Sequence, residues 1–200
     1  RIEMSFARAL RTILRQDPDV VMIGEIRDLE TAQIAVQASL TGHLVFATLH
    51  TNDSVSAVTR LVDMGVEPFL LASSLIGVVA QRLVRRLCLE CRKLLAADDA
   101  QLLALGFTPP DHSQAQGPPA FHAPQGCVAC KRTGYRGRTG IYELLSVEDD
   151  LRRLIHDRAS EQILRAHVTA QGMRSLRDDG MRWAAQGVIS LEEVVRVTRE

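Results

Sequence analysis

The chain has 200 residues, 46% of them apolar, which is enough to bury the core of one large domain or two small ones. Its 24 basic residues balance 24 acidic ones, so it lacks the strongly basic composition of many nucleic-acid-binding proteins. The longest nearly apolar stretch, residues 69–80, falls short of the roughly 20 residues that a membrane span needs. No signal peptide opens the sequence, and we expect a cytoplasmic protein.

The first informative stretch is a short apolar run that ends in an acid. A helix predicted over residues 4–15 stops before Pro18, and residues 20–23 (Val-Val-Met-Ile) then predict a strand buried on both faces of a parallel sheet. Glu25 follows at the carboxyl end of this strand. Open α/β sheets bind ligands at that edge, where an acid can order a magnesium ion or the attacking water in phosphoryl transfer. Such an acid can equally meet solvent or cap the next helix.

A second apolar run, residues 42–50, ends in His50. The residues between the two runs, Leu29 to Leu40, have helical spacing, with Asp28 placed to cap the helix and Gly42 to end it. Strand, helix and strand joined by a right-handed crossover make the two strands parallel. We therefore expect Glu25 and His50 to emerge on the same edge, although a single histidine in an apolar run is more often an ordinary core or surface residue.

Further helices are predicted after His50. Residues 54–64 form one, closed by Gly65, and residues 68–86 form a long one. Near the carboxyl terminus, residues 150–156, 160–171, 175–186 and 190–199 all have helical patterns. The last of these opens with a Ser-x-x-Glu capping box made by Ser190 and Glu193, and Trp183 is expected to be buried. The glycine-punctuated residues 134–145 predict a turn that leads into a strand or the start of a helix.

Four cysteines form two Cys-x-x-Cys pairs, Cys88 with Cys91 and Cys127 with Cys130. Two such pairs supply the four thiolates of a tetrahedral structural zinc site. The spacer between the pairs is long because residues 108–125, rich in Pro, Gln, Ala and Gly, read as a loop insert. A reducing compartment disfavours disulfides. A thioredoxin-like redox pair is the alternative.

Basic residues surround these cysteines in the sequence, as they would in a zinc ribbon that grips phosphates. They are Arg85, Arg86, Arg92, Lys93, Lys131, Arg132, Arg136 and Arg138. A zinc-dependent module that binds nucleic acid or an anionic membrane is therefore a rival function. Among aromatic residues only Tyr135 lies beside the second pair, so base stacking has little to use, and we expect no sequence-specific nucleic-acid partner.

Two of these stretches resemble a known family. Residues 20–28, Val-Val-Met-Ile-Gly-Glu-Ile-Arg-Asp, resemble the atypical Walker B box of bacterial secretion ATPases, in which Gly24 stands where many such strands carry aspartate. Residues 41–52, Thr-Gly-His-Leu-Val-Phe-Ala-Thr-Leu-His-Thr-Asn, resemble their histidine box. The resemblance covers essentially the whole chain, and residues 63–70 and 190–198 are most similar to the type II secretion ATPases.

The resemblance implies an α/β fold: the C-terminal part of a RecA-like P-loop ATPase domain, with an inserted tetracysteine zinc lobe and a C-terminal helical subdomain. Residues 1–86 would be the ATPase core, 87–137 the zinc lobe and 138–200 the helical subdomain. The Gly-x-x-x-x-Gly-Lys-Ser/Thr loop that cradles phosphates is absent from the chain, so we expect it, with the general base, upstream of residue 1. The isolated 200 residues should then be inactive.

The implied function is an ATP-hydrolysing motor that powers pseudopilus assembly and the export of folded proteins; a type IV pilus assembly ATPase is the alternative. Glu25 would hold magnesium or orient water, and His50 would approach the γ-phosphate as a sensor. His43 would be structural. The implied cofactors are ATP, Mg²⁺ and Zn²⁺. The implied partners are other copies of the chain, in a hexamer, and an inner-membrane secretion platform on which the cytoplasmic motor sits.

Overall fold

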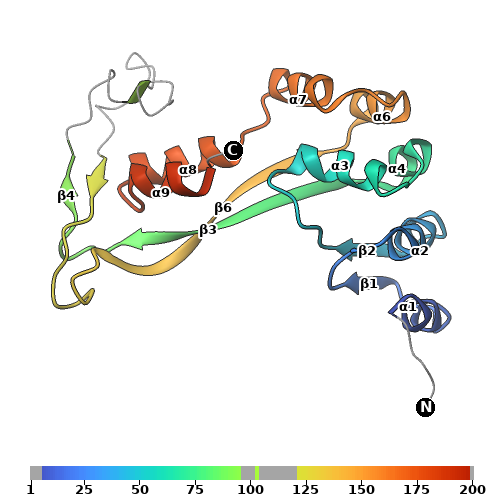
Figure 1. Cartoon of the computed structure of the whole chain (residues 1–200), viewed down its shortest axis with the longest axis horizontal. Coiled ribbons are helices and arrows are strands. Elements are labelled where there is room, and N and C mark those ends of the chain that lie inside the picture. The colour runs from blue at the N-terminus through green and yellow to red at the C-terminus, as the bar shows by residue number, and fades with distance from the viewer. Residues whose placement is uncertain (1–5, 96–101, 104–120, 199–200) are drawn as a thin grey trace. The chain divides into compact units, whose positions relative to one another are not determined.

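The computed structural model describes residues 6–95, 102–103 and 121–198 (Figure 1). These residues belong to two compact units. The first unit comprises Arg1–Val79 and Leu144–Met173, and the second comprises Ala80–Glu143 and Arg174–Glu200. The loop insert predicted over residues 108–125 lies mostly outside the described residues. The chain thus enters each unit twice.

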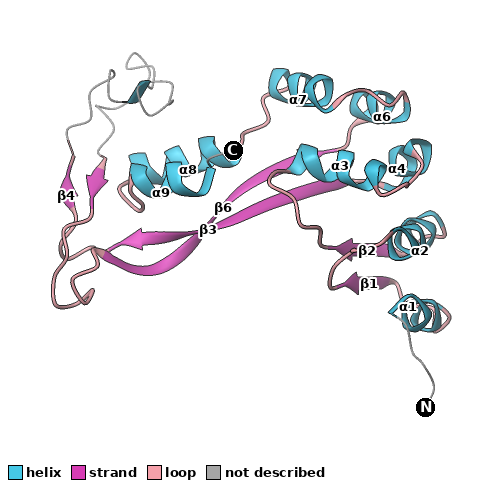
Figure 2. Ribbon diagram, viewed as in Figure 1, coloured by secondary structure: helices cyan, strands magenta, loops and turns pink. Residues whose placement is uncertain are grey.

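The amino-terminal half of the first unit has the predicted strand, helix and strand. Helix α1 (Phe6–Leu14) is followed by β1 (Val20–Ile23), α2 (Leu29–Leu40) and β2 (Leu44–Ala47) (Figure 2). The two strands are parallel, in a register that pairs Val20 with Leu44 and Ile23 with Ala47. Asp28 caps α2, since its carboxylate accepts a 2.7 Å hydrogen bond from the amide of Thr31. The predicted order and the parallel direction are confirmed.

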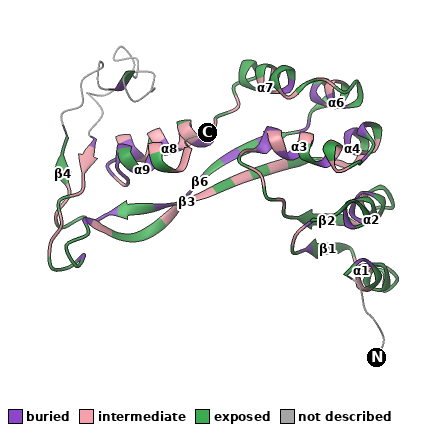
Figure 3. Cartoon of the chain, in the orientation of Figure 1, coloured by how far each residue is buried: buried purple, intermediate pink, exposed green. Residues whose placement is uncertain are grey.

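Strand β1 is buried on one face only, which corrects the expectation of burial on both faces. Val21 and Ile23 are 5% and 1% exposed, whereas Val20 and Met22 are 53% and 78% exposed (Figure 3). On β2, Phe46 is also 53% exposed. The described sheet here has two strands, and the core beneath it includes residues of α1 and α2. An apolar face of the sheet is therefore left open within the described chain.

Four more helices complete the first unit: α3 (Ser54–Asp63), α4 (Pro68–Ser74), α6 (Asp149–His156) and α7 (Glu161–Ala170). Helix α4 packs against α6, while α7 packs against both α3 and α6. Their buried residues share one apolar core with the strands, including Val58, Leu71, Leu151 and Leu164. Two segments far apart in the sequence thus form one fold.

The long helix predicted over residues 68–86 is wrong in its second half. Helix α4 ends at Ser74, and β3 runs from Gly77 to Leu87 as the partner of β6 (Tyr135–Ser146). Apolar residues in this stretch fit a period of two as well as a period of 3.6, and β-branched residues such as Val78 favour the strand. The partner strand lies about 50 residues away, so no local pattern reveals it. β6 agrees with the strand alternative predicted for residues 134–145.

The second unit combines a short sheet with two helices. Strand β4 (Lys93–Leu94) pairs antiparallel with β5 (His122–Ala123), and helices α8 (Leu176–Ala185) and α9 (Leu191–Thr198) follow later in the chain. A Cβ at Gly180 of α8 would lie 2.9 Å from a methyl of Val194 on α9, so only glycine allows this approach. The helices predicted in both units after residue 147 are confirmed. Trp183, expected to be buried, is half-buried.

A buried carboxylate ties α9 to β3 in the second unit. Glu193 is 0% exposed and accepts hydrogen bonds from the backbone amide of Arg85 at 2.9 Å and from the guanidinium of Arg196 at 2.8 Å. The guanidinium of Arg85 also donates to it and lies 4.1 Å from the centre of the Tyr135 ring. The predicted capping box is half formed: the amide of Glu193 donates to Ser190 Oγ at 3.3 Å, but the Glu193 carboxylate faces the arginines.

This environment sets the charge of Glu193. Burial alone would raise its pKa, but the hydrogen bonds from Arg196 and Arg85 outweigh burial and lower the pKa from 4.5 to about 2. A lowered pKa in the folded state means that the ionised carboxylate stabilises the fold fully above its ordinary pKa. That contribution is lost as the pH falls from 4.5 toward about 2.

We therefore expect Glu193→Gln to destabilise the protein by about 2–3 kcal/mol at pH 7, because it leaves two arginines without their buried anion. The loss should shrink below about pH 3, where the wild-type carboxylate also begins to protonate. Urea unfolding at pH 7 and at a pH below about 3 measures the free energy of unfolding of the variant and of the wild type. Glu192→Gln, on the exposed side of α9, is the control. Equal stability of Glu193→Gln and wild type at pH 7 would contradict this role.

None of the helices in the described part of the chain combines the length and the apolar composition that crossing a membrane requires.

Candidate functional site

Glu25 and His50 lie together at the carboxyl edge of the parallel strand pair. The pairing continues just past the strand ends, where the amide of Ile26 donates to the carbonyl of Thr48 at 2.9 Å. The Thr48 hydroxyl also donates to the carbonyl of Gly24. These bonds hold the two segments side by side, and His50 Nε2 lies 2.9 Å from Glu25 Oε2. The structure thus brings together the two residues that the sequence analysis singled out.

Arg27 is a third member of this group, and the sequence analysis gave it no role. Its guanidinium forms an ion pair with Glu25 Oε1, while His50 holds the other carboxylate oxygen. Arg27 lies two positions after Glu25, in the segment between β1 and α2. Glu25, Arg27 and His50 form the group that we call the carboxylate edge.

The electrostatics of the carboxylate edge favour an ionised acid. The guanidinium of Arg27 lowers the pKa of Glu25 most; partial burial opposes it, and the hydrogen bond with His50 adds to the lowering. Glu25 therefore carries a negative charge at neutral pH and presents two acceptor oxygens. Its partners are exposed, Arg27 at 74% and His50 at 89%, so both can turn away to admit a ligand.

The donor set at this edge fits a magnesium ion. Mg²⁺ takes oxygen ligands and is held in nucleotide sites by one or two carboxylates together with phosphate oxygens. Glu25 supplies an ionised carboxylate of this kind, and His50 supplies a neutral or charged donor beside it. The edge thus has the chemistry to hold a metal–phosphate group, with a nitrogen donor next to the acid.

The loop that carries His50 ends at Asp53, the amino-terminal cap of α3. Asp53 Oδ1 accepts from the Ser56 amide at 2.8 Å in a full capping box, and Oδ2 accepts from Arg165 of α7 at 2.9 Å. Partial burial would raise the pKa of Asp53, but the bonds from Ser56 and Arg165 outweigh it and lower the pKa. Neither Asp53 nor Arg165 was assigned a role from the sequence.

His43 is used in ending α2. Its Nδ1 lies 3.0 Å from the carbonyl of Ala38 and 3.2 Å from the hydroxyl of Thr41, and its own amide donates to Ala38 at 3.1 Å. Gly42 takes a left-handed conformation with φ of 101° at this helix end. These contacts belong to a helix terminus and give His43 the structural role predicted for it.

The four cysteines converge in the second unit. Their sulfur atoms all lie within 4.8 Å of one another, with 3.9 Å from Cys88 to Cys127 and 3.8 Å from Cys91 to Cys130. A tetrahedral zinc ion with bonds of about 2.3 Å sets its sulfur ligands about 3.8 Å apart. All four are free thiols. The cluster therefore fits a zinc ion, which would supply four metal–sulfur bonds that join the two pairs.

Backbone amides donate hydrogen bonds to two of the four cysteine sulfur atoms. Cys130 Sγ accepts from the amide of Cys127 at 3.1 Å and from that of Gly134 at 3.2 Å, and Cys91 Sγ accepts from Gly126 at 3.3 Å. The amide of Cys127 is the first cause that lowers the pKa of Cys130, to about 6, while burial raises the pKa of Cys91 to about 11. A bound zinc ion favours the thiolate at every ligand.

Several of the basic residues around the cysteines have partners inside the second unit. Arg85 binds Glu193, Arg92 donates to the carbonyl of Gly187, and Arg136 lies 3.5 Å from Glu90. These interactions help to hold the region together and engage three of the eight basic residues that the rival nucleic-acid module would use.

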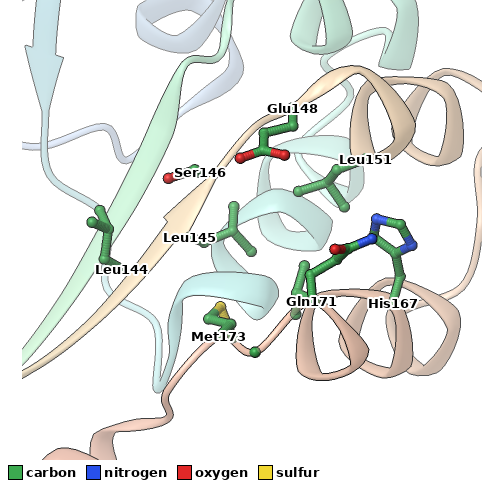
Figure 4. Close-up of a pocket in the computed structure, with 10 residues that line it drawn as sticks. Leu144, Leu145, Ser146, Glu148, Leu151, His167, Gln171 and Met173 are labelled. Carbon is green, nitrogen blue, oxygen red and sulfur yellow. The ribbon is translucent and has the colours of Figure 1, made fainter.

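A separate cavity of about 240 Å³ lies in the first unit between β6, α6 and α7 (Figure 4). Its apolar lining includes Leu145 and Leu151, and Glu148, His167 and Gln171 stand around it. None of the residues predicted for catalysis or metal binding lines it. The carboxylate edge and the cysteine cluster are therefore the two candidate sites of the described chain.

Comparison with known proteins points in one direction. Residues 1–196 match the model of the family described as type II/IV secretion system protein. Type II secretion system protein HxcR of Pseudomonas aeruginosa is 62% identical, and type II secretion system ATPase E of Vibrio cholerae is 58% identical, each over 200 residues. Both alignments cover 100% of this chain but 38% of the relative. The chain thus spans well under half the length of these relatives.

Solved structures agree at the level of the fold. The pilus retraction motor PilT, solved with bound ADP, gives a TM-score of 0.66 at 28% identity and covers 98% of this chain and 44% of its own. The ATPase DotB of Legionella pneumophila gives 0.64 at 20% identity, with 96% and 42% covered, and bears on the fold alone. The α/β fold is therefore that of secretion ATPases.

The geometry of the cysteine cluster predicts that the protein binds zinc. We expect elemental analysis to find about one zinc ion per chain. Cys127→Ser should lower the zinc content and the melting temperature of the second unit, because removing one of four ligands weakens a site whose binding energy is folding energy. Val128→Ser, beside it and 89% exposed, is the matched control. A metal-free protein that is fully folded with four free thiols would contradict the zinc assignment.

Proposed function

The chain belongs to the family of type II/IV secretion system proteins, and on this premise we propose that it is part of the ATP-hydrolysing motor of a type II secretion system. The full-length motor would power pseudopilus assembly and the export of folded proteins. The single observation that carries the proposal is the 2.9 Å contact between Glu25 and His50 at the carboxyl edge of two parallel strands.

Each member of the carboxylate edge has a distinct task in this proposal. Glu25, kept ionised by Arg27 and His50, would hold the magnesium of Mg–ATP or orient the attacking water. Magnesium, when bound, neutralises charge on the phosphates. His50 donates a hydrogen bond toward the γ-phosphate that strengthens as negative charge develops. The ion pair between Arg27 and Glu25 would break when Mg–ATP binds, and the Arg27 guanidinium would stay nearby as a cation.

The rest of the full-length protein would complete the site. The chain spans 38% of the length of its relatives. The phosphate-binding loop would lie in a part of the full-length protein outside these 200 residues. The open face of β1 and β2 supports this arrangement, because Met22 at 78% and Phe46 at 53% exposure need a cover. We propose that the RecA-like core is completed there, with residues 1–86 as its C-terminal part.

The remaining assignments follow the same premise. Residues 87–137 would be a zinc lobe held by Cys88, Cys91, Cys127 and Cys130. Of the helical subdomain expected over residues 138–200, α6 and α7 belong to the first unit and α8 and α9 to the second. The motor would work as a hexamer at the cytoplasmic side of an inner-membrane platform. A type IV pilus assembly ATPase is the second candidate, favoured by the likeness to the retraction motor PilT. The identities of 52% to 62% with type II proteins favour secretion.

In the full-length protein, Glu25→Gln should lower the turnover number for ATP about 10²–10³-fold and leave ATP binding nearly unchanged, because the amide keeps the shape but not the charge. Steady-state hydrolysis and equilibrium nucleotide binding measure the two effects. Glu30→Gln, which removes an exposed ion pair with Arg11, is the matched control. Unchanged turnover in Glu25→Gln would remove this residue from the mechanism.

His50→Ala should lower turnover on the order of 10²-fold while the melting temperature stays near the wild-type value, because an 89% exposed side chain contributes little to packing. Hydrolysis assays run beside melting curves measure both. His156→Ala on α6, another exposed histidine with a carboxylate neighbour, is the control. Full activity of His50→Ala would refute the sensor role.

A further inference from the structure

The loop that carries His50 is fixed at both of its ends, by different parts of the first unit. At its start, the carbonyl of Thr48 accepts from the amide of Ile26 at 2.9 Å, which ties it to the β1 side. At its end stands Asp53, which is followed directly by α3. His50 lies between these anchors, three residues before Asp53. The position of its imidazole therefore depends on where both anchors are held.

The second anchor is tied directly to one arginine of α7. Asp53 divides its carboxylate between two tasks: Oδ1 caps α3 through the Ser56 amide at 2.8 Å, and Oδ2 accepts from Arg165 Nη2 at 2.9 Å. The cap fixes the carboxylate to its own helix, and α3 itself is packed into the core through Val55. The bond from Arg165 fixes the carboxylate of Asp53 directly to α7.

Arg165 is itself held in place. Its Nη2 also donates to Glu161 Oε1 at 2.7 Å, one turn earlier on α7, and Glu161 Oε2 accepts from the Thr59 hydroxyl of α3 at 3.2 Å. Beneath these polar groups, Val55 and Leu164 belong to the shared apolar core. The side chains of Asp53 and Arg165 are 19% and 38% exposed, so water screens their bond only in part. The bridge is a built contact between α3 and α7.

We propose that Arg165 is a positioning residue for His50, acting through Asp53, and that it links the α6–α7 segment to the carboxylate edge. Asp53 is three positions after His50, so the segment between their Cα atoms spans at most about 11 Å and has little slack. A shift of Asp53 is then passed along the loop to the backbone of His50, which sets where its imidazole can reach. This inference rests on the proposed function of His50 in ATP hydrolysis.

A purely structural role for Arg165 predicts a different outcome. If the bridge served only to hold α3 against α7, its loss would lower stability and reduce activity by the same factor whether or not His50 is present. A positioning role acts through His50 alone. Its loss should therefore have no further effect once the imidazole has been removed, because residues that act as a unit are not additive.

The test uses the full-length protein, five single variants that include His50→Ala, and one double variant. Arg165→Gln removes the donor, and Asp53→Asn removes the charge of the acceptor but keeps a good helix cap. Arg158→Gln, which breaks the ion pair with Glu67 in the same unit, is the matched control. Arg165→Lys restores a cation without the guanidinium. The double variant Arg165→Gln with His50→Ala completes a double-mutant cycle with the wild type and the two single variants.

We expect Arg165→Gln and Asp53→Asn each to lower kcat for ATP about tenfold, with KM changed less than about twofold. Arg165→Lys should recover part of the loss, and Arg158→Gln should resemble wild type. In the His50→Ala background, Arg165→Gln should have no further effect. An equal drop in both backgrounds, or wild-type kcat in Arg165→Gln, would overturn the positioning role. If Arg165→Gln does not fold, Asp53→Asn carries the same comparison.

A second readout separates this inference from the proposed function. Hydrogen exchange at the amides of residues 48–53 should speed up at least severalfold in Arg165→Gln and stay at the wild-type rate in Arg158→Gln. Wild-type protein that hydrolyses no ATP would refute the proposed function, and the exchange result would still decide whether Arg165 fixes the loop. Unchanged exchange in these amides would overturn the anchor.

Discussion

The parallel pairing of β1 with β2 is the constraint on which the candidate site depends. A parallel pair places the carboxyl ends of both strands at one edge, so residues that follow the strands meet even though they are 25 positions apart. An antiparallel pair, or a register shift of one residue, would turn Glu25 and His50 away from each other. The hydrogen bonds from the amide of Ile26 and the hydroxyl of Thr48 extend this pairing beyond the strands. They hold the backbone segments that carry Glu25 and His50 side by side.

Local sequence patterns were sufficient for the elements of this site. Strand, helix and strand, the Asp28 cap and the meeting of Glu25 with His50 all follow from apolar periodicity and handedness. The patterns failed where a distant partner decides the structure. Residues 77–87 fit two periodicities, and pairing with β6 selects the strand. Arg165 lies 112 residues from Asp53, and no local sequence pattern near either residue predicts their hydrogen bond.

The second unit has its own apolar core, which includes Val84, Phe121 and Ile141, and the cysteine cluster adds a second point at which distant segments meet. The turns that carry the two pairs lie between two strand pairs: the long strands β3 and β6 on one side, and β4 and β5, with two residues each, on the other. The amide of Cys88 donates to the carbonyl of Gly134 at 2.9 Å and continues the contact from β3 and β6 toward the cysteines. Four metal–sulfur bonds would fix their distance and direction, and they leave the spacer between the pairs free to vary in length.

Both units use one carboxylate to hold a helix start and a distant arginine together. Asp53 caps α3 and binds Arg165, and Glu193 lies in the first turn of α9 and binds Arg85. A helix start attracts negative charge, so the acid is stabilised there before any arginine arrives. The arginine then converts a local cap into a contact between segments far apart in the sequence. The consequence differs with burial. At Glu193, with a side chain 1% exposed, loss of the charge is chiefly a loss of stability. At Asp53, with a side chain 19% exposed beside the His50 loop, loss of the arginine can release the loop while the fold survives.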